Sequence, residues 1–443
     1  MKKIITLIVV ALAMTMSINA ADTFINGVKY SVSYLGNFAM VDGYNEDLPA
    51  AVVIEDKVTI DGTEYNVEHI NNRTFYGNEA ITSVKLPTGL KYLDSYAFEN
   101  CTNLETVTNL PTTNLESVGD RVFNSTKWIR NLEGDGVYLL GGWAIAYLGE
   151  PPVNLIMPDE TVGICYGFLR AHGGSYAEWK LESVVLNEGL KRIESRAFEY
   201  CSALTEINIP STVYSIDGDA FNACWGLTSF NVAEDNTTFS AIDGVLFMNS
   251  HDLKLYPQGR TEESYTAPAG TLDVLGYAFY GAGNLKTLVF PEGVKRVYEQ
   301  AIRDMGSLET IDYPSTITQV GNAGTFYGCN ELKAIIIRAT EVPNCGGTDL
   351  SASTFDNTII YVPSESLEAY KASSYFGKIN QSEGRDNIKS LDNYISGVET
   401  LDEDEGVTEV VRYDIAGREL SAPIKGVNIV RYSNGTIKKV IVK

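Results

Sequence analysis

The sequence predicts a solenoid, a stack of short coils that is mainly β, with short helical or 3-10 turns. Three observations predict this fold class. A pattern of apolar residues recurs along the chain with a usual step of 23 residues. A proline precedes most copies of an aromatic anchor by 11 or 12 residues. Hydrophobic residues make up 44% of the 443 residues, which is enough to build a core.

The repeat is clearest where its copies align without gaps. Segments 182–201 (ESVVLNEGLKRIESRAFEYC) and 205–224 (TEINIPSTVYSIDGDAFNAC) match position by position, and further copies lie at 82–101, 286–305 and 309–329. The aromatic anchors are Phe75, Phe98, Phe123, Phe198, Phe221, Phe279 and Phe326, with Ile302 as a substitute and a weaker unit that pairs Pro158 with Leu169. We therefore expect about nine units between residues 67 and 330.

Residues 204–224 indicate how one unit folds. Ile207 and Ile209 lie on one side of a short strand that follows Leu204, because side chains alternate along a strand. Pro210 ends the strand, since proline lacks the N–H that a ladder needs. Phe221 then returns to the core. Such a coil exposes an apolar face on each side and is stable only when neighbours stack on it. The sequence thus predicts a leucine-rich-repeat solenoid.

The remaining segments are expected to interrupt or close the stack. Two long intervals, 128–180 and 231–265, contain extended apolar segments around turn sequences and predict β-hairpin insertions that project from the stack. The expected order along the chain is a leader (1–20), an N-terminal β cap (21–66), the repeats (67–330), a C-terminal solenoid cap (331–382), an acidic linker (383–406) and a small all-β C-terminal unit (407–443).

The first twenty residues have the features of a secretory signal peptide. Lys2 and Lys3 precede an apolar run from Ile4 to Ala13, and small residues follow. A membrane-spanning helix is the alternative, but it needs about 20 apolar residues. Cys101 is the first cysteine, so no lipid anchor is expected near the cleavage region. We therefore expect an exported protein.

Charge and motifs exclude several classes of function. The formal net charge of −23 disfavours binding to nucleic acid and to anionic membrane surfaces. The three histidines offer little for metal binding or proton transfer. The nucleophile-elbow, phosphate-loop and zinc-protease motifs do not occur in the sequence. We expect no catalytic residue, no cofactor and no metal site.

The repeats, which follow L-x-x-I-x-I-P-x-x-V-x-x-I-G-x-x-A-F-x-x-C, resemble the BspA-like branch of leucine-rich repeats over roughly residues 50–383. The tail resembles the C-terminal sorting modules of exported proteins from Bacteroidetes-type Gram-negative bacteria, through Tyr413, Asp414, Gly417 and Arg418. The resemblance implies a secreted or cell-surface protein, outside or on the outer surface of a Gram-negative bacterium. It also implies adhesion and protein binding, and it carries over no catalytic residue.

Two surfaces are candidates for binding. The outward face of the first strand in each coil is the expected binding surface of a solenoid, and the inserted loop 170–179 carries tyrosine and tryptophan, which are common in interaction hot spots. In both places the alternative is that the side chains pack within the fold. The same two alternatives, recognition or packing, apply to Trp128 and Trp143. The candidate residues are Lys85, Asn208 and Asp312 on the strands and His172, Tyr176 and Trp179 in the loop.

Four of the six cysteines occupy one position of the repeat, three residues after the anchor phenylalanine: Cys101, Cys201, Cys224 and Cys329. They fit small buried hydrophobes. The alternative is a disulfide between Cys201 and Cys224, which belong to adjacent coils. Cys165 and Cys345 have no obvious mates.

These observations predict a monomeric, non-enzymatic binding protein that adheres to or recognises an extracellular protein or glycoprotein of a host or another cell. Two alternatives stay open. One is a carbohydrate-binding or carbohydrate-processing surface protein that uses the inserted aromatic residues. The other is a structural surface component, which would self-associate without a foreign ligand.

Overall fold

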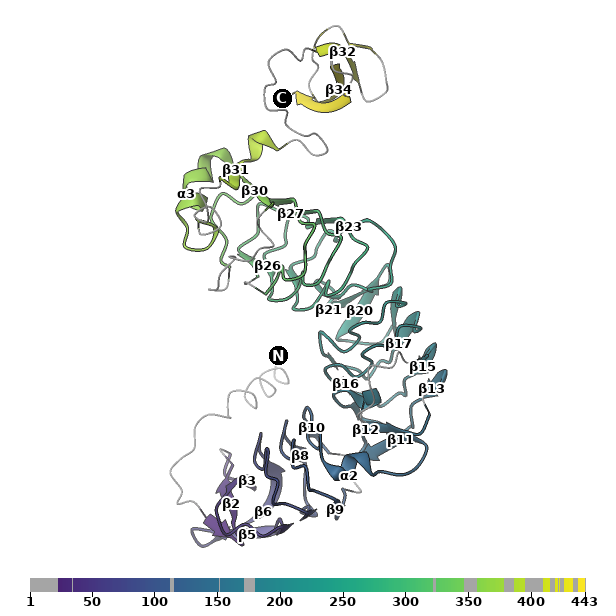
Figure 1. The fold of residues 1–443 in the computed structure, drawn as a ribbon, viewed down its shortest axis with the longest axis vertical. Helices are drawn as coiled ribbons and strands as arrows, with labels where there is room; N and C mark the ends of the chain where they lie inside the picture. Colours follow the sequence, from purple (N-terminus) through teal and green to yellow (C-terminus); the bar gives the residue numbers. More distant parts are fainter. Residues whose placement is uncertain are drawn as a thin grey trace. The chain divides into compact units, whose positions relative to one another are not determined.

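The structure, a computed structural model, describes residues 23–33, 35–111, 115–150, 152–170, 180–321, 324–345, 357–377, 386–394, 409–414, 419–420, 422, 426–432 and 437–442. The chain forms two compact units. The first comprises Met1–Arg260 with Tyr277–Ala282, and the second comprises Thr261–Gly276 with Gly283–Lys443. Within each unit, short strands from successive coils stack in parallel, so the predicted solenoid is confirmed (Figure 1).

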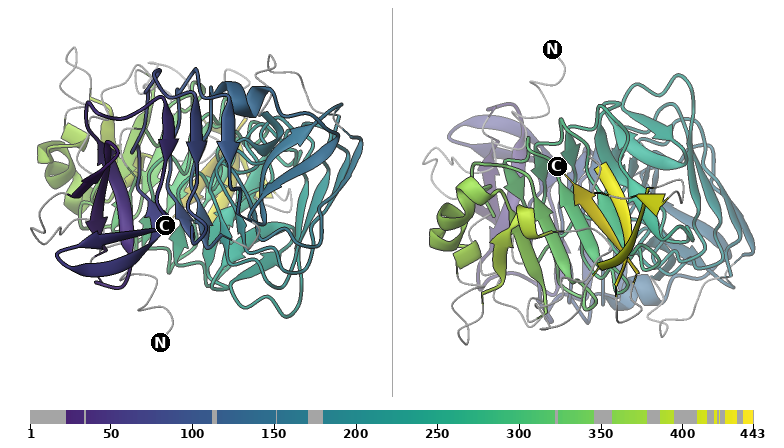
Figure 2. Two further views of the ribbon diagram at one scale, coloured as in Figure 1. Left: turned by 90° about the horizontal axis from the view of Figure 1, so that it is seen from below. Right: turned by 90° about the horizontal axis from the view of Figure 1, so that it is seen from above.

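Each regular coil of the first unit contributes one strand to each of two ladders. The first ladder includes β4 (Ala51–Val53), β7 (Ser83–Lys85) and β9 (Thr106–Thr108), and Ser83 pairs with Thr106, its equivalent in the next coil. The second includes β6 (Thr63–Ile70), β8 (Tyr92–Leu93) and β10 (Ser117–Val118). Figure 2 (left) shows the consecutive strands of this part, purple to blue, side by side.

The same two-ladder arrangement recurs in the later coils of this unit. First strands pair as β13 (Asn154–Ile156) with β15 (Ser183–Val185), and as β17 (Glu206–Ile209) with β19 (Ser229–Val232). Second strands form a separate ladder of β12 (Trp143–Leu148), β14 (Gly163–Ile164), β16 (Arg192–Ile193) and β18 (Ser215–Ile216). In Figure 1, β13, β15 and β17 lie on one side of the coils and β16 lies on the other.

The anchor side chains fill the interior that the coils share. All the predicted anchors are buried, including Ile302 and Leu169, and Phe168 beside Leu169 is buried as well. Consecutive anchor rings stack on each other: the centroids of Phe75 and Phe98 are 5.1 Å apart, and those of Phe98 and Phe123 are 5.3 Å apart. This confirms that the regular apolar positions face inward.

The two long intervals form the predicted hairpins. β11 (Gly136–Leu140) pairs antiparallel with β12, and β20 (Phe239–Ile242), β21 (Val245–Met248) and β22 (Asp252–Leu255) form an antiparallel meander. The expectation that they project from the stack is wrong. One face of each hairpin is apolar and is buried with the core, and β12 itself pairs with β14 as a rung of the second ladder.

The second unit has the same two-ladder construction. Its first ladder is β23 (Ser264–Thr266), β25 (Thr287–Val289), β27 (Thr310–Tyr313), β29 (Ala334–Ile337), β30 (Ile359–Val362) and β31 (Ile388–Ser390). Its second ladder is β24 (Asp273–Val274), β26 (Arg296–Val297) and β28 (Gln319–Val320). Figure 2 (right) shows its green strands side by side. β31 lies in the predicted linker, so the ladder extends into that segment, because Ile388 finds a buried place against β30.

Antiparallel strands precede the first coils. β1 (Thr23–Ile25), β2 (Val28–Val32) and β3 (Ala39–Tyr44) form a meander whose last strand joins β6 in parallel, and β5 (Lys57–Ile60) forms a hairpin with β6. The C-terminal strands β32 (Glu409–Asp414), β33 (Glu419–Leu420), β34 (Gly426–Tyr432) and β35 (Ile437–Val442) form a small antiparallel sheet, as predicted.

The helical segments of the described residues are short. They are α2 (Lys127–Arg130), η2 (Phe168–Arg170), η4 (Ser364–Ser366), α3 (Leu367–Ala372) and η5 (Leu391–Asn393). Ser366 precedes α3 but makes no side-chain capping hydrogen bond, because its Oγ donates to Thr340 O at 2.6 Å. Within the described residues, no helix has the length and apolar character needed to cross a membrane.

Candidate binding site

The predicted strand-face residues lie on separate sheets. Lys85 is exposed on β7 and Asn208 is exposed on β17, whereas Asp312 is half-buried on β27 of the second unit. The Asp312 carboxylate accepts hydrogen bonds from Arg338 Nε at 2.8 Å and Nη2 at 2.7 Å. The structure therefore does not bring these three residues together in one ladder.

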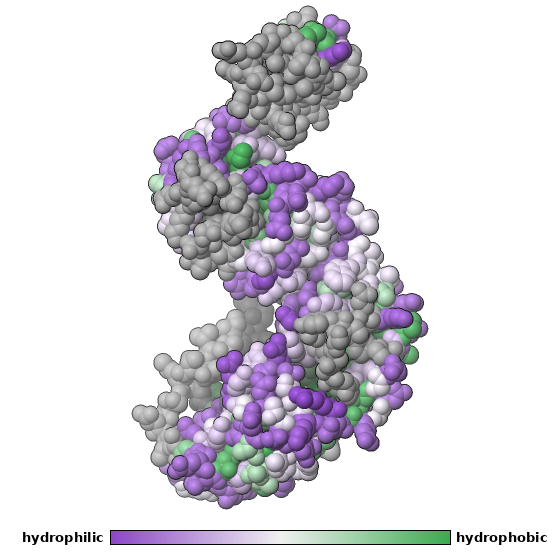
Figure 3. Space-filling model, in the orientation of Figure 1, coloured by the Kyte–Doolittle hydropathy of each residue, from purple (hydrophilic) through white to green (hydrophobic). Residues whose placement is uncertain are grey.

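The strand face also carries an apolar spot on the two-stranded sheet β13–β15. Ile156 and Val185 are direct partners in this sheet and are 73% and 57% exposed. Green atoms at the right edge of Figure 3 lie over these strands. Two side chains make a small patch, and isolated exposed apolar residues are ordinary on protein surfaces.

The predicted loop residues His172, Tyr176 and Trp179 lie outside the described residues. Trp128 and Trp143, which the sequence left open between packing and recognition, are both buried. Trp143 is only 1% exposed, and its Nε1 donates to Leu115 O at 3.0 Å. These two tryptophans therefore belong to the packing of the hairpin on the coils.

All six cysteines are buried free thiols. Cys101, Cys224 and Cys329 each donate from Sγ to the backbone carbonyl of an anchor in the preceding coil, at 3.0, 3.2 and 3.1 Å. Burial raises the pKa of Cys101 to about 11 and that of Cys329 to about 12. The repeated cysteine is thus a small buried residue that ties one coil to the next.

A surface that the sequence reasoning missed flanks the anchors. We call the following residues of the first unit the turn face: Arg73, Tyr76, Tyr96, Arg121, Tyr166, Tyr200, Trp225, Tyr277 and Tyr280. Trp225 is 53% exposed, and Tyr76 is exposed as well. Tyrosine, tryptophan and arginine are the residue types most enriched in interaction hot spots. The sequence signal is a recurrent arginine or tyrosine two residues before the anchor, as in DSYAF, GDRVF and ESRAF.

The backbone conformation explains why these side chains lie beside the anchors. Arg73, Tyr96 and Arg121 have φ values of 57°, 64° and 52°, in the left-handed region that reverses the chain after the second strand. Neighbouring side chains then meet across coils. The Arg73 guanidinium lies 5.2 Å from the Tyr96 ring centroid, and the Arg121 guanidinium lies 4.5 Å from that of Tyr166. Cation–π contacts of this kind hold the flat side chains in place.

The turn face contains a crevice at its later coils. The crevice is lined by Asp219, Asn222, Tyr256, Gln258, Tyr277 and Tyr280 together with apolar core residues, and it is shallow and open to solvent. The rings of Tyr277 and Tyr280 have centroids 5.7 Å apart, and Tyr200 and Trp225 meet edge to face at 6.2 Å. The crevice exists because the β20–β22 meander brings Tyr256 and Gln258 beside the coil of Phe221.

Several polar groups in the crevice have defined hydrogen-bond partners. Asn222 Nδ2 donates to Glu199 Oε1 at 3.1 Å, and Asp219 Oδ2 accepts from Arg196 Nε at 3.3 Å. Gln258 Nε2 donates to Tyr280 O at 2.7 Å. Gln258 Oε1 is buried and has no donor in the part of the chain that the structure describes. An amide oxygen that is removed from water without a donor is a place for a ligand hydroxyl or a bound water.

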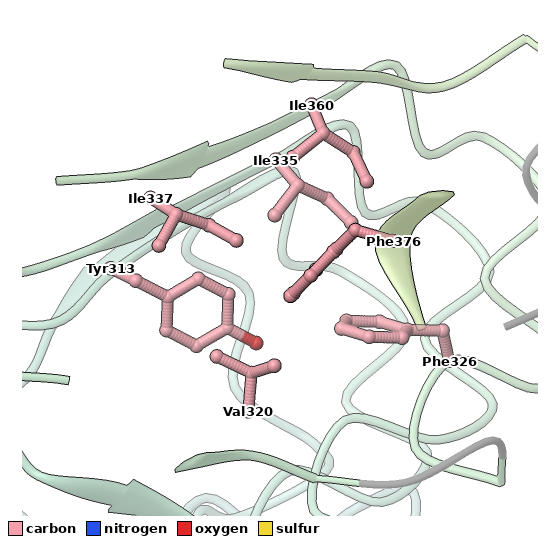
Figure 4. Close-up of a pocket in the computed structure, with 7 residues that line it drawn as sticks. All are labelled: Tyr313, Val320, Phe326, Ile335, Ile337, Ile360 and Phe376. Atoms are coloured by element: carbon pink, nitrogen blue, oxygen red, sulfur yellow. The ribbon is translucent and has the colours of Figure 1, made fainter. Parts of the chain in front are cut away.

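A second pocket, in the second unit, is a packing gap. Figure 4 shows isoleucine side chains, Val320, Phe326 and Phe376 facing one another around the Tyr313 ring. All these side chains are buried, so the lining offers no exposed polar group for a ligand. This gap is part of the hydrophobic interior of the second unit.

A buried ionic cluster lies at the end of the second strands of the first unit. Arg192 Nε and Glu194 Oε1 are 2.8 Å apart. Burial raises the pKa of Glu194 to about 7, against the opposing effect of Arg192. Burial also raises the pKa of Asp120 to about 6, with repulsion from Asp217 adding to it. Among the residues described, no group of three or more His, Cys, Asp or Glu side chains is placed to hold a metal ion.

Parallel two-ladder coils, stacked anchors and recurrent turns define a leucine-rich-repeat solenoid. The chain belongs to the BspA-type leucine-rich repeat family, whose model matches six copies over residues 57–138, 172–255 and 260–381. No curated protein matches the sequence significantly.

Solved structures of bacterial leucine-rich repeat proteins are similar to this chain. A leucine-rich cell surface protein from Faecalibacterium prausnitzii is 23% identical, with 85% of this chain and 96% of that chain covered and a TM-score of 0.44. The pneumococcal vaccine antigen PcpA is 18% identical, with 84% and 97% covered and a TM-score of 0.40. A leucine-rich repeat protein from Eubacterium ventriosum is 20% identical, with 77% of each chain covered and a TM-score of 0.41.

Proposed function

We propose that this protein is a secreted or cell-surface, non-enzymatic binding protein that recognises an extracellular protein or glycoprotein through its turn face. The observation that carries the proposal is the series of tyrosine, tryptophan and arginine side chains beside successive anchors. These side chains are large, they are fixed by cation–π and ring contacts, and they recur from coil to coil. A rigid aromatic surface loses little conformational entropy on binding, which favours recognition.

The predicted leader supports export, and family membership supports a repeat scaffold rather than a catalytic one. Adhesion to host or partner-cell proteins is part of the proposal. The strand-face residues Lys85, Asn208 and Asp312, and the loop residues His172, Tyr176 and Trp179, stay predictions for a second contact area.

Binding of the mature chain, residues 21–443, to immobilised matrix proteins, mucin and whole bacterial cells tests the proposal. We expect saturable binding to at least one of these surfaces, and we expect Trp225→Ala to weaken it about 30-fold, as at a hot spot of about 2 kcal/mol. The matched control is Val185→Ser on the strand face, which should leave the affinity unchanged. Absence of saturable binding to every surface would contradict the proposal, and so would a loss confined to Val185→Ser.

A structural surface component is the competing function. It predicts assembly of the purified mature chain without any foreign ligand. Light scattering across a range of protein concentrations distinguishes the two, because the proposed binding protein stays monomeric.

A further inference from the structure

The crevice on the turn face has the side chains of a sugar-binding subsite. Tyr277 and Tyr280 supply half-exposed ring surface, and Asn222 and Asp219 supply planar polar groups nearby. Gln258 contributes an amide oxygen that is buried and has no donor among the described residues. A sugar ring has flat C–H faces that pack on aromatic rings and hydroxyl groups that both donate and accept hydrogen bonds.

We propose that this crevice binds a neutral sugar unit of a glycan carried by the partner. The inference rests on the proposed function, and it names the part of the partner that the turn face recognises. In the complex, a sugar hydroxyl donates to Gln258 Oε1, and the ring packs against Tyr280. The amide nitrogen of Gln258 is already fixed by its bond to Tyr280 O at 2.7 Å, so its oxygen is oriented before the ligand arrives.

Electrostatics favours a neutral sugar over an acidic one. The Asp219 carboxylate lines the crevice, and the chain carries a formal net charge of −23. The nearby Arg196 guanidinium is engaged by Asp219 at 3.3 Å and by Glu199 at 3.7 Å, so it is not available to a ligand carboxylate or sulfate. A sialylated or sulfated sugar would therefore be repelled.

The buried amide oxygen of Gln258 also argues against an apolar peptide side chain as the occupant. A leucine or phenylalanine inserted there would cover Gln258 Oε1 without offering it a donor. Leaving a buried acceptor unsatisfied weakens binding, whereas a hydroxyl satisfies it. Binding of a peptide in this crevice in place of a sugar would therefore contradict the proposal.

In the first experiment, neutral oligosaccharides of hexose and N-acetylhexosamine are titrated into the mature chain, and calorimetry measures their binding. Sialylated oligosaccharides serve as the charged comparison. We expect saturable binding of at least one neutral oligosaccharide, with Kd on the order of 0.1–1 mM for a single subsite. Tyr280→Ala and Gln258→Leu should each weaken it about tenfold. Tyr214→Ala is the matched control, because Tyr214 is an exposed tyrosine outside the turn face and does not line the crevice.

Asn222→Ala, on the crevice rim, should weaken binding as well and covers the case in which Gln258→Leu fails to fold. Circular dichroism identifies any variant that is misfolded. Equal affinity of wild type, Tyr280→Ala and Asn222→Ala for the sugar overturns the assignment to this crevice. Tighter binding of the sialylated oligosaccharides overturns the choice of a neutral sugar.

The second experiment separates this inference from the proposed function. The immobilised glycoprotein that binds the mature chain is treated with glycosidases and measured again. Loss of binding supports the sugar subsite. If binding persists after deglycosylation and no free oligosaccharide binds, the sugar inference fails while the proposed function stands. If no glycoprotein, protein or oligosaccharide binds, both fail.

Discussion

The rings of Phe198 and Phe221 lie face to face, with centroids 5.5 Å apart and planes 5° apart, although they are 23 residues apart in the chain. Phe221 in turn meets Phe230 edge to face at 5.5 Å. An anchor therefore packs against the coils on both of its sides. This stacking is the physical content of the repeat, because each coil buries an apolar face only when the next coil covers it.

Replacing Phe221 by alanine should remove this contact and lower the free energy of unfolding of the first unit by about 3–5 kcal/mol. Urea titration followed by circular dichroism measures the change. Tyr214→Ala is the control, since Tyr214 is an exposed aromatic residue of the same coil and should change stability by less than about 0.5 kcal/mol. A Phe221→Ala protein as stable as the control would mean that the anchors do not hold the coils together.

Asn236 fastens the β20–β22 meander to the coil before it. Its Nδ2 donates to Pro210 O at 2.8 Å and to Val213 O at 2.9 Å, and its Oδ1 accepts from Phe239 N at 2.7 Å. Asn236→Ala should destabilise the chain by about 2–3 kcal/mol, because these buried backbone groups lose their partner. In Asn231→Ala, by contrast, only exposed hydrogen bonds are lost, and a comparable destabilisation there would refute the special role of Asn236. Thermal or urea unfolding of both variants measures the difference.

Glu194 should make stability depend on pH. Its pKa is raised from an ordinary 4.5 to about 7 in the folded chain, so the folded state holds a proton that the unfolded state has lost between these values. The contribution of this group to stability is therefore full below pH 4.5 and declines as the pH rises to 7. The decline amounts to about 3 kcal/mol for a shift of this size.

Glu194→Gln removes this titration. Urea unfolding at pH 5 and pH 8 should show a smaller loss of stability on going to pH 8 in Glu194→Gln than in the wild type. Comparing the two proteins cancels the contributions of the other carboxyl groups, including Asp120, whose pKa is raised in the same direction. An identical pH dependence in wild type and variant would show that Glu194 is ionised in the folded protein throughout this range.

The cysteines should be inert in the folded protein. All six thiols are buried, and burial raises the pKa of Cys101 and Cys329. A thiol reagent should label essentially none of them under native conditions and all of them in denaturant, because the reactive species is the exposed thiolate. Mass spectrometry of non-reduced digests checks the pair left open by the sequence. A cross-linked peptide joining Cys201 and Cys224 would contradict the free thiols of the structure.

Features set by local periodicity could be predicted from the sequence. The anchors, the prolines that end the first strands, the buried cysteines and the antiparallel hairpins all follow from residue type and spacing. The prediction that the hairpins project failed at β12. Whether Trp143 faces solvent or core depends on which strand pairs with β12, and that partner, β14, is chosen by packing rather than by the hairpin sequence.

The sequence by itself therefore determined the coil and its interior. The same apolar side chains must be buried in every repeat, and their regular spacing makes this requirement visible in the sequence. Only the tertiary structure decided which polar side chains meet. Gln258 and Tyr280 share a crevice with Asn222 because an inserted meander and two coils converge there, and no periodic pattern connects them. Surface residues are free of the burial constraint that makes the repeat visible, so their juxtaposition depends on the folded chain.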